Sequence, residues 1–490
     1  MNRKVTYILI LLLVVIVHDS SAQNSQVLYH MNLPQNYLLN PGIRPTSLLY
    51  IGLPALSGVN LNINNNFVNF SDVFINNPTD TTVITILHPD YDITEFLPKI
   101  KDINSIESGV LVQLLGLGFN VGKDLYIFLD INERVDANVL LPGDLLRLGF
   151  EGNEQFVGSR IDLSSLRGDV KYYREAGLGF SKNFTDRLRI GVKGKVLFGI
   201  TSASIDNKSL GLTVNDDYSH TVDADLTVNL SAPVNVYINA ENNIDSIKID
   251  TSRFDGTKNF INYFLETQNM GLGLDIGAEF RFSDNLKISA AITDLGYIKW
   301  KKDISNLEAE SQFNFSGYDL QDVYDEKMTF DSLSKELIDS LKNSFILTDT
   351  KTPFTTYLPF GVSVGGSYNL TKNLSLGLLS YTRITGKQVR EALTVSANLN
   401  FGNLFSTSIA YTMANKTYDN MGFGLAFRAG MFQIYAIADR IPMTWDKVIL
   451  SKAKIPIPEN WKTFNARIGL NLTFGNMVLS KNDKPMILVQ

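Results

Sequence analysis

The chain has 490 residues, of which 44% are hydrophobic and 19% are charged, and its formal net charge is -6. A mean hydropathy of +0.01 is too high for a disordered chain and too low for a bundle of membrane helices. The near balance of 44 basic and 50 acidic residues gives no electrostatic footprint for nucleic acid, and the lack of cysteine excludes disulfide scaffolds and thiol catalysis.

The first 22 residues have the three parts of a secretory signal peptide. Arg3 and Lys4 form a basic start, and residues 8–17 are an unbroken apolar run of ten. Ten residues are too few for a helix to cross roughly 30 Å of hydrocarbon, so the run does not predict a membrane anchor. Ser20 and Ala22 satisfy the small-x-small rule of signal peptidase. We predict export, with cleavage after Ala22.

Residues 23–57 are apolar but have no regular period. Pro34, Pro41, Pro45 and Pro54 forbid a continuous helix or a central strand. Eight leucine and tyrosine residues lie between positions 33 and 53 of the same segment. An irregular apolar segment must be buried to satisfy its backbone polar groups, so we expect it inside whatever the following strands enclose.

Residues 58–474 alternate between apolar and polar positions over long stretches. In the clearest stretch, 464–474, six apolar residues alternate with five that are polar or glycine, and 222–230, 270–282 and 393–401 repeat the pattern. Strands of a soluble sandwich average about five or six residues, whereas a tilted membrane strand needs about 9–11. The fold class predicted is all-β: a single transmembrane antiparallel β-barrel rather than a soluble sandwich or solenoid.

Short and long connections alternate between these strands. The short ones are at 183–187, 283–285, 370–373, 402–403 and 430, and the long ones are at 201–219, 241–267, 301–353 and 441–462. Outer-membrane barrels have short periplasmic turns and long external loops, which places residues 475–490 in the periplasm as a tail. A count of 16 segments includes a weak first strand near Val59 and a short one at 234–239, so the range is 14 to 16.

Two regions have helical periodicity instead. Residues 331–343, within the longest loop, predict a short amphipathic helix on the external side. Residues 90–106 have the same period, interrupted by Pro98, and would either cap the barrel mouth or fold into it.

If the apolar stripe of each strand faces lipid, the other stripe faces the lumen. The charged residues that this assignment turns inward are Arg189, Lys193, Lys195, Asp223, Asp225, Asp275, Glu279, Arg281 and Lys287. Both signs are interleaved, so the lumen is either a salt-bridged interior that stiffens the barrel or a hydrated permeation path. The lumen is also the natural place for residues 23–57, which we predict to form a plug around Asn40 and Pro41.

No motif in the chain predicts an enzyme, a metal site or a cofactor site. Residues 361–365 match G-x-S-x-G, but the strand alternation continues through them and no helix follows. The histidines are far apart in sequence and have no metal-ligand spacing. No phosphate-binding lysine motif is present.

Several short stretches of the chain form a recognisable set: Leu39-Asn40-Pro41-Gly42, Ile51-Gly52-Leu53-Pro54, the run 294–300, Phe423-Gly424-Leu425 and the run 432–435. Together they resemble an uncharacterised outer-membrane barrel family of the Bacteroidota. The family is distantly similar to the long-chain fatty-acid transporter superfamily and to the barrel subunit of the type IX secretion system. The resemblance implies 14 strands and an N-terminal hatch, although Gly42 stands where the entry motif usually has alanine. It transfers no ligand-binding residue.

Two functions remain open from the sequence. The first is transport or gating of a hydrophobic or amphipathic solute through a hatch-plugged lumen, in a barrel surrounded by outer-membrane lipid. The second is a barrel that does not transport, whose external loops bind surface or secretion proteins. Trp445 and Trp461 bracket the apolar run 455–458 in one loop, and exposed aromatic residues are typical of partner surfaces.

Overall fold

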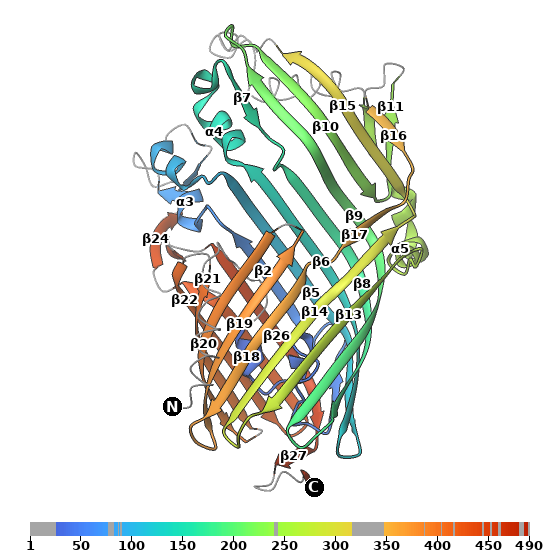
Figure 1. Ribbon diagram of the computed structural model, residues 1–490, viewed down its shortest axis with the longest axis vertical. Coiled ribbons are helices and arrows are strands. Elements are labelled where there is room, and N and C mark those ends of the chain that lie inside the picture. Colours follow the sequence, from blue (N-terminus) through green and yellow to red (C-terminus); the bar gives the residue numbers. More distant parts are fainter. Residues whose placement is uncertain are drawn as a thin grey trace.

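The computed structural model confirms the predicted fold class: the chain forms a closed antiparallel β-barrel of 14 strands (Figure 1). The structure describes residues 26–76, 83–86, 88, 91–239, 244–315, 347–386, 388–402, 404–414, 417–442, 445–450, 453–458, 462–479 and 485–488. The predicted signal peptide and the predicted helix at 331–343 lie outside the described residues.

Neighbouring strands in the barrel wall are consecutive in the sequence. β1 and β2 together form one wall strand, and so do β17 and β18. The wall strands are β1 (Leu49–Gly52), β2 (Val59–Asn65), β5 (Ile103–Val121), β6 (Leu125–Pro142), β8 (Arg167–Asn183), β9 (Leu188–Val214), β13 (Asn269–Arg281), β14 (Leu286–Trp300), β17 (Phe354–Tyr357), β18 (Phe360–Asn369), β19 (Leu374–Thr385), β20 (Gln388–Phe401), β21 (Phe405–Ala414), β22 (Thr417–Ala429), β23 (Phe432–Pro442) and β26 (Thr463–Phe474). The last strand, β26, pairs with β23 on one side and with β1 and β2 on the other, which closes the barrel.

The first wall strand begins earlier than the sequence predicts. Leu49 is paired with both Phe119 and Phe474, so β1 already belongs to the wall, and the predicted boundary at residue 58 is wrong. The strand is interrupted after Gly52 and resumes at Val59. Alternation failed to show β1 because only four residues of it are extended before Pro54, too few to establish a period of two.

The two ends of the barrel differ. At one end, the turn end, tight turns join β5 to β6, β8 to β9, β13 to β14 and β18 to β19, and the hairpin of β27 (Asn476–Leu479) and β28 (Pro485–Leu488) lies there (Figure 1). At the other end, the loop end, β9 continues beyond the wall and pairs with β7 (Ser159–Asp162) and β10 (His220–Ser231), and β10 pairs with β15 (Ile304–Phe315), which pairs with β16 (Leu347–Thr350).

The other elements outside the barrel lie at its loop end. They are α3 (Phe70–Val73), β3 (Phe74–Asn76), β4 (Val83–Thr85), η2 (Ile93–Glu95), η3 (Leu97–Lys99), α4 (Gly143–Glu151), η4 (Glu154–Phe156), β11 (Val234–Ile238), β12 (Ile244–Ile249), η5 (Thr251–Phe254), α5 (Gly256–Phe264), β24 (Trp445–Leu450) and β25 (Ala453–Pro458). The helical period at 90–106 thus becomes two short 3-10 turns, whose Phe96 and Ile100 pack with Phe67 on the side chains of α4. The segment at 234–239 forms a separate hairpin, β11 with β12, rather than a wall strand.

Burial in the wall is the reverse of burial in a water-soluble protein. On β13, Leu272 is 55% exposed and Ile276 is also exposed, whereas the alternate residue Asp275 is fully buried. The same inversion holds on β20, where Val395 is exposed while Thr394 and Asn398 are buried. An outward apolar stripe over a polar interior needs lipid around it, so the barrel spans a membrane with its strands. Every described helix is too short or too polar to cross a membrane.

Candidate functional site

The lumen contains a buried cluster of three cations and four carboxylates, carried by β6, β8, β9, β13 and β14. Its members are Arg134, Lys193 and Lys195 with Asp130, Glu175, Asp275 and Asp294. Lys193 Nζ lies 2.8 Å from Asp130 Oδ2 and 2.7 Å from Glu175 Oε1. Lys195 Nζ lies 2.7 Å from Asp275 Oδ1 and 2.6 Å from Asp294 Oδ1. Each ammonium group is therefore shared by carboxylates from two strands, so the cluster ties five strands together.

A β-bulge brings Asp294 into this cluster. The register of β13 against β14 shifts between Leu274 and Ile276, and Asp294 adopts a positive φ of 62°. The backbone N–H of Asp294 then donates to Asp275 Oδ1 at 2.7 Å, and its carboxylate accepts from Arg134 Nη1 at 2.7 Å. A bulge commonly re-aims a side chain in this way, and here it places a further carboxylate among the cations.

The chain before β1 lies inside the barrel, and residues 26–48 are called the plug below. Its first helix, α2 (Gln26–His30), is buried against strands β19 to β23. The Val27 N–H donates to Asp439 Oδ1 at 2.9 Å, and Thr394 Oγ1 donates to Gln26 Oε1 at 2.6 Å. Apolar packing of α2 on the wall is thus combined with polar contacts at its first turn.

The second helix of the plug, η1 (Pro34–Leu38), crosses to the other side of the lumen. Gln35 and Asn471 exchange hydrogen bonds between their side-chain amides, at 2.7 and 3.1 Å. The Tyr37 ring stacks on Phe128 with a centroid distance of 4.6 Å, and Lys193 Nζ lies 5.6 Å from the centre of the same ring. The plug is therefore seated directly on the buried ion cluster.

The predicted plug residues Asn40 and Pro41 form a turn against wall positions that have no side chain. Asn40 Nδ2 donates to the carbonyl oxygen of Ala278 at 3.3 Å. A Cβ atom added at Gly191 would lie 2.0 Å from the Pro41 carbonyl oxygen, and one added at Gly277 would lie 2.0 Å from Asn40 Oδ1. Only glycine permits an approach this close, so the wall at β9 and β13 forms a socket for this turn.

A cavity lies on the turn side of the plug. It encloses about 1130 Å³, part of it open to solvent, and Tyr29, Asn32 and Ile43 of the plug line one wall of it. Four of the predicted inward charges line the opposite wall: Arg189, Glu279, Arg281 and Lys287. Arg189 Nη1 lies 3.3 Å from Glu279 Oε1, which leaves an excess of positive charge among the side chains that line this cavity.

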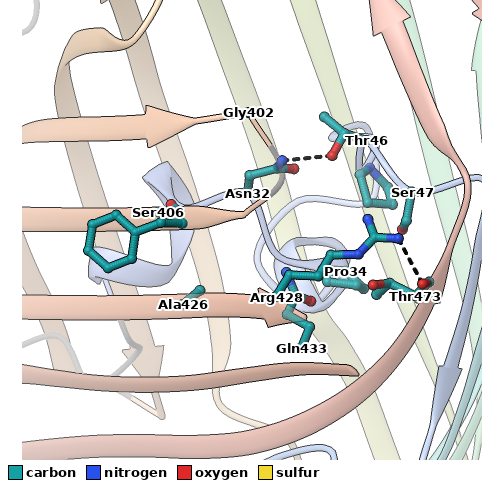
Figure 2. Close-up of a pocket in the computed structure, with 12 residues that line it drawn as sticks. Asn32, Pro34, Thr46, Ser47, Gly402, Ser406, Ala426, Arg428, Gln433 and Thr473 are labelled. Carbon is teal, nitrogen blue, oxygen red and sulfur yellow. Dashed lines mark hydrogen bonds between the residues drawn. The ribbon is translucent and has the colours of Figure 1, made fainter. Parts of the chain in front are cut away.

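A smaller pocket of about 370 Å³ lies beside it, between the plug and β21, β22, β23 and β26 (Figure 2). In Figure 2, Asn32 donates from Nδ2 to Thr46 Oγ1 at 2.7 Å within the plug. Arg428 Nη2 donates to the Thr473 carbonyl oxygen at 2.8 Å within the wall. The first of these two hydrogen bonds is internal to the plug, and the second is internal to the wall.

Another cavity, of about 520 Å³ and partly open to solvent, lies on the loop side of the plug. Apolar side chains of the plug and of β5 line one part of it: Leu28, Leu38, Leu39 and Leu111. Polar and charged wall residues line another part of it: Asn60, Asn62, Arg134, Asp136, Arg383 and Arg467. Arg383 Nε and Arg467 Nη1 are buried and have no hydrogen-bond partner among the described residues.

Ion pairs cross the lumen at this level. Arg383 Nη2 lies 3.6 Å from Asp136 Oδ1, and Arg390 pairs with Glu107. The two arginines are on β19 and β20, whereas the two carboxylates are on β6 and β5, on the opposite side of the barrel. Side chains of opposite walls thus meet across the lumen on the loop side of the plug.

Two predicted lumen residues lie elsewhere. Asp223 and Asp225 are on β10, which pairs with the part of β9 beyond the barrel wall, and their partners are the exposed Arg160 and Lys208. Their assignment to the lumen is corrected, because alternation shows which side of a strand a residue faces but not whether the strand lies within the membrane.

The sequence prediction omitted Asp130, Arg134, Glu175 and Asp294 from the lumen. Alternation could have identified Asp130, since aliphatic residues alternate with polar and aromatic ones along 125–132. It could not have identified Asp294, because the bulge breaks the period at that residue.

Of the predicted partner residues, Trp445 is 52% exposed on β24, and Trp461 lies outside the described residues.

The described part of the chain contains no group of three His, Asp or Glu side chains that could hold a metal ion. Ser363, the serine of the G-x-S-x-G match, is in the middle of β18, opposite Ala291 and Tyr381 of the adjacent strands. It therefore lacks the strand-turn-helix setting of a nucleophile elbow.

Comparison with known proteins gives a family and distant structural neighbours. A family model described as "Family of unknown function (DUF5723)" matches residues 41–439. No curated protein matches the chain. The toluene transporter TbuX of Ralstonia pickettii aligns with 8% identity and a TM-score of 0.41, over 92% of this chain and 98% of that one. A FadL homologue of Pseudomonas aeruginosa aligns with 9% identity and a TM-score of 0.41, over 94% and 99% of the two chains.

The buried cluster predicts a large loss of stability when one cation is removed. We expect Lys193→Met to destabilise the barrel by about 3–5 kcal/mol, because Asp130 and Glu175 would keep buried charges without their shared partner. Urea unfolding in lipid vesicles measures this loss. Lys208→Met is the control, since that lysine pairs with Asp225 at the surface and should change stability by less than about 0.5 kcal/mol. Equal effects of the two substitutions would contradict the role given to the cluster.

The glycine socket predicts that a side chain at one wall position loosens the plug. In Gly191→Leu the new side chain meets the Pro41 carbonyl, and overpacking of this kind costs about 1–3 kcal/mol. Amide exchange in residues 31–43 should accelerate by roughly fivefold to a hundredfold as a result. Gly194→Leu on the same strand is the matched control, because no atom lies within 4 Å of its added Cβ. Unchanged exchange in Gly191→Leu would refute the socket.

Proposed function

The chain belongs to the DUF5723 family, and we propose that it is an outer-membrane barrel that passes a hydrophobic or amphipathic solute through a lumen closed by a displaceable plug. In this proposal the turn end faces the periplasm and the loop end faces the cell exterior, as in other outer-membrane barrels. The observation that carries the proposal is the position of the plug, between one cavity on the loop side and another on the turn side.

The way the lumen is filled supports a movable closure. A barrel of purely structural function can fill its interior with side chains from its own strands. Here a separate segment occupies the interior, and its turn at Asn40 and Pro41 rests on wall glycines with few hydrogen bonds. Movement of that segment would join the two cavities without breaking any strand pairing.

The lining of the loop-side cavity supports the class of solute. Leu28, Leu38 and Leu39 offer an apolar surface on the plug, and the guanidinium groups of Arg383 and Arg467 lie on the wall. A pocket that combines an apolar surface with a few polar groups suits a molecule of the same kind. An amphipathic molecule in this cavity would touch the plug with its apolar part, and would compete with Asp136 for Arg383 through a polar group.

A disulfide between plug and wall tests whether the plug moves. A Cβ atom added at Gly422 lies 2.7 Å from a Cγ atom of Val27, so the pair Val27→Cys and Gly422→Cys is close enough for a disulfide in a chain that has no other cysteine. We expect the oxidised variant to lose uptake of radiolabelled laurate by whole cells, and a reductant to restore it. The two single variants are controls for the substitutions themselves.

If the fully oxidised double-cysteine variant took up laurate at the wild-type rate, the proposal would be refuted. A second measurement, the conductance of the reconstituted protein in planar bilayers, should rise when residues 26–48 are deleted, because this deletion removes the plug and keeps β1 in the wall. A conductance equal to that of the wild type would show that the plug does not close a path.

A further inference from the structure

A short amphipathic helix lies on the outside of the barrel, and nothing in the proposed transport function uses it. Helix α5 follows the 3-10 turn η5 and precedes β13. Figure 1 shows it outside the wall, near the loop-side end of β13. Three of its apolar side chains are turned to the surroundings: Phe260 at 49%, Ile261 at 47% and Leu265, just after the helix, at 56% exposure.

Other side chains of α5 fix it to the barrel. The Tyr263 hydroxyl is 2.5 Å from Thr201 Oγ1 on β9, and the Phe264 ring is 6.0 Å from the ring of Tyr172 on β8. On either side of the helix, Arg253 Nη2 donates to Asp303 Oδ1 at 2.6 Å and Lys302 pairs with Glu266. These contacts hold the helix against the wall, so its apolar exposure is a fixed feature of this surface.

The helix sits at the border of the lipid-facing band. Exposed apolar residues on β13 extend from Phe280 near the turn end to Met270 near the loop end. Ten residues of strand rise about 33 Å, which for strands tilted by about 40° spans about 25 Å of membrane, the usual height of the apolar band. β13 begins at Asn269, opposite Gly199, so the contact of α5 with Thr201 places it just beyond this band.

The polar residues around the helix match such a border. Lys258, Asn259 and Asn262 are exposed on α5, on the side opposite Phe260 and Phe264. Lys299 and Tyr297 are exposed on β14, and Tyr357 of β17 pairs with Tyr297 at the same level. Aromatic residues and lysines typically mark the boundary between the hydrocarbon and the lipid headgroups.

We propose that α5 lies in the external leaflet of the membrane, with Phe260, Ile261 and Leu265 among the lipid acyl chains and Lys258 at the level of the headgroups. The lipid is the occupant that the position of the helix favours, because the helix lies on the outer surface of the barrel, next to the loop-side end of the exposed apolar stripe of β13 (Figure 1). An interfacial helix buries its apolar face about 5–10 Å below the headgroups. Here the helix would anchor the loop 232–268, and with it the rim of the barrel, to one depth in the membrane.

Site-directed spin labelling tests this position, and the lack of cysteine in the chain permits single labels at chosen positions. The probes are Phe260→Cys, Ile261→Cys and Leu265→Cys in the purified full chain, reconstituted in phosphatidylcholine vesicles. Leu272→Cys marks the lipid-facing band, Lys258→Cys marks the polar side of the same helix, and Lys208→Cys marks water. Collision of each label with oxygen, which concentrates in lipid, is compared with collision with a water-soluble nickel complex.

We expect the three apolar positions to show an oxygen-to-nickel ratio several-fold above that of Lys258→Cys and Lys208→Cys, and close to that of Leu272→Cys. A ratio equal to that of Lys208→Cys would place the helix in water and overturn the proposal. Low accessibility to both reagents would overturn it as well, because a second copy of the chain would then cover the helix. Neither result depends on whether the lumen transports a solute.

Discussion

The structure depends on one constraint: polar groups that the wall turns away from lipid must find their partners inside the barrel. Lipid takes the apolar stripe of every strand, so lysines, arginines and carboxylates of the other stripe share a narrow interior. A charge buried there without a partner costs several kcal/mol. Lys193 and Lys195 meet this requirement by sharing four carboxylates, and the bulge at Asp294 supplies one of them. The register shift between β13 and β14 lies where this carboxylate joins the cluster.

The same constraint explains how the interior is filled. The charged side chains of the cluster pair with one another on one wall of the lumen. The Tyr37 ring of the plug packs against this cluster, over Lys193. Small wall residues leave room for α2 elsewhere in the lumen, and the turn at Asn40 lies against glycines of β9 and β13, two of the strands that carry the cluster. The plug thus packs against the wall without being part of it. The cavities on its two sides are the parts of the lumen that it does not fill. Ion pairs such as Arg383 with Asp136 join residues of opposite walls on the loop side of the plug.

Much of the fold could be predicted from the sequence because membrane strands have a strong local signature. Each of the stretches 270–282, 393–401 and 464–474 shows its two faces without reference to any other segment. The plug could be predicted too, since prolines and leucines together demand burial without a regular period. The site was predicted less well. Lys193, Lys195 and Asp275 were identified as inward residues, whereas Asp223 was misplaced and Asp294 was omitted.

By itself, the sequence determined the fold class, the inward or outward side of most wall residues and the segment that fills the lumen, because these depend on period and composition along the chain. Only the tertiary structure decided which charges meet, since Arg134 and Asp294 are 160 residues apart and come together through strand order and a bulge. The tertiary structure also decided that β10 lies beyond the barrel wall. Only the first part of β9 pairs with β13 in the wall, the rest pairs with β10, and the alternation of β9 does not show where one part ends and the other begins.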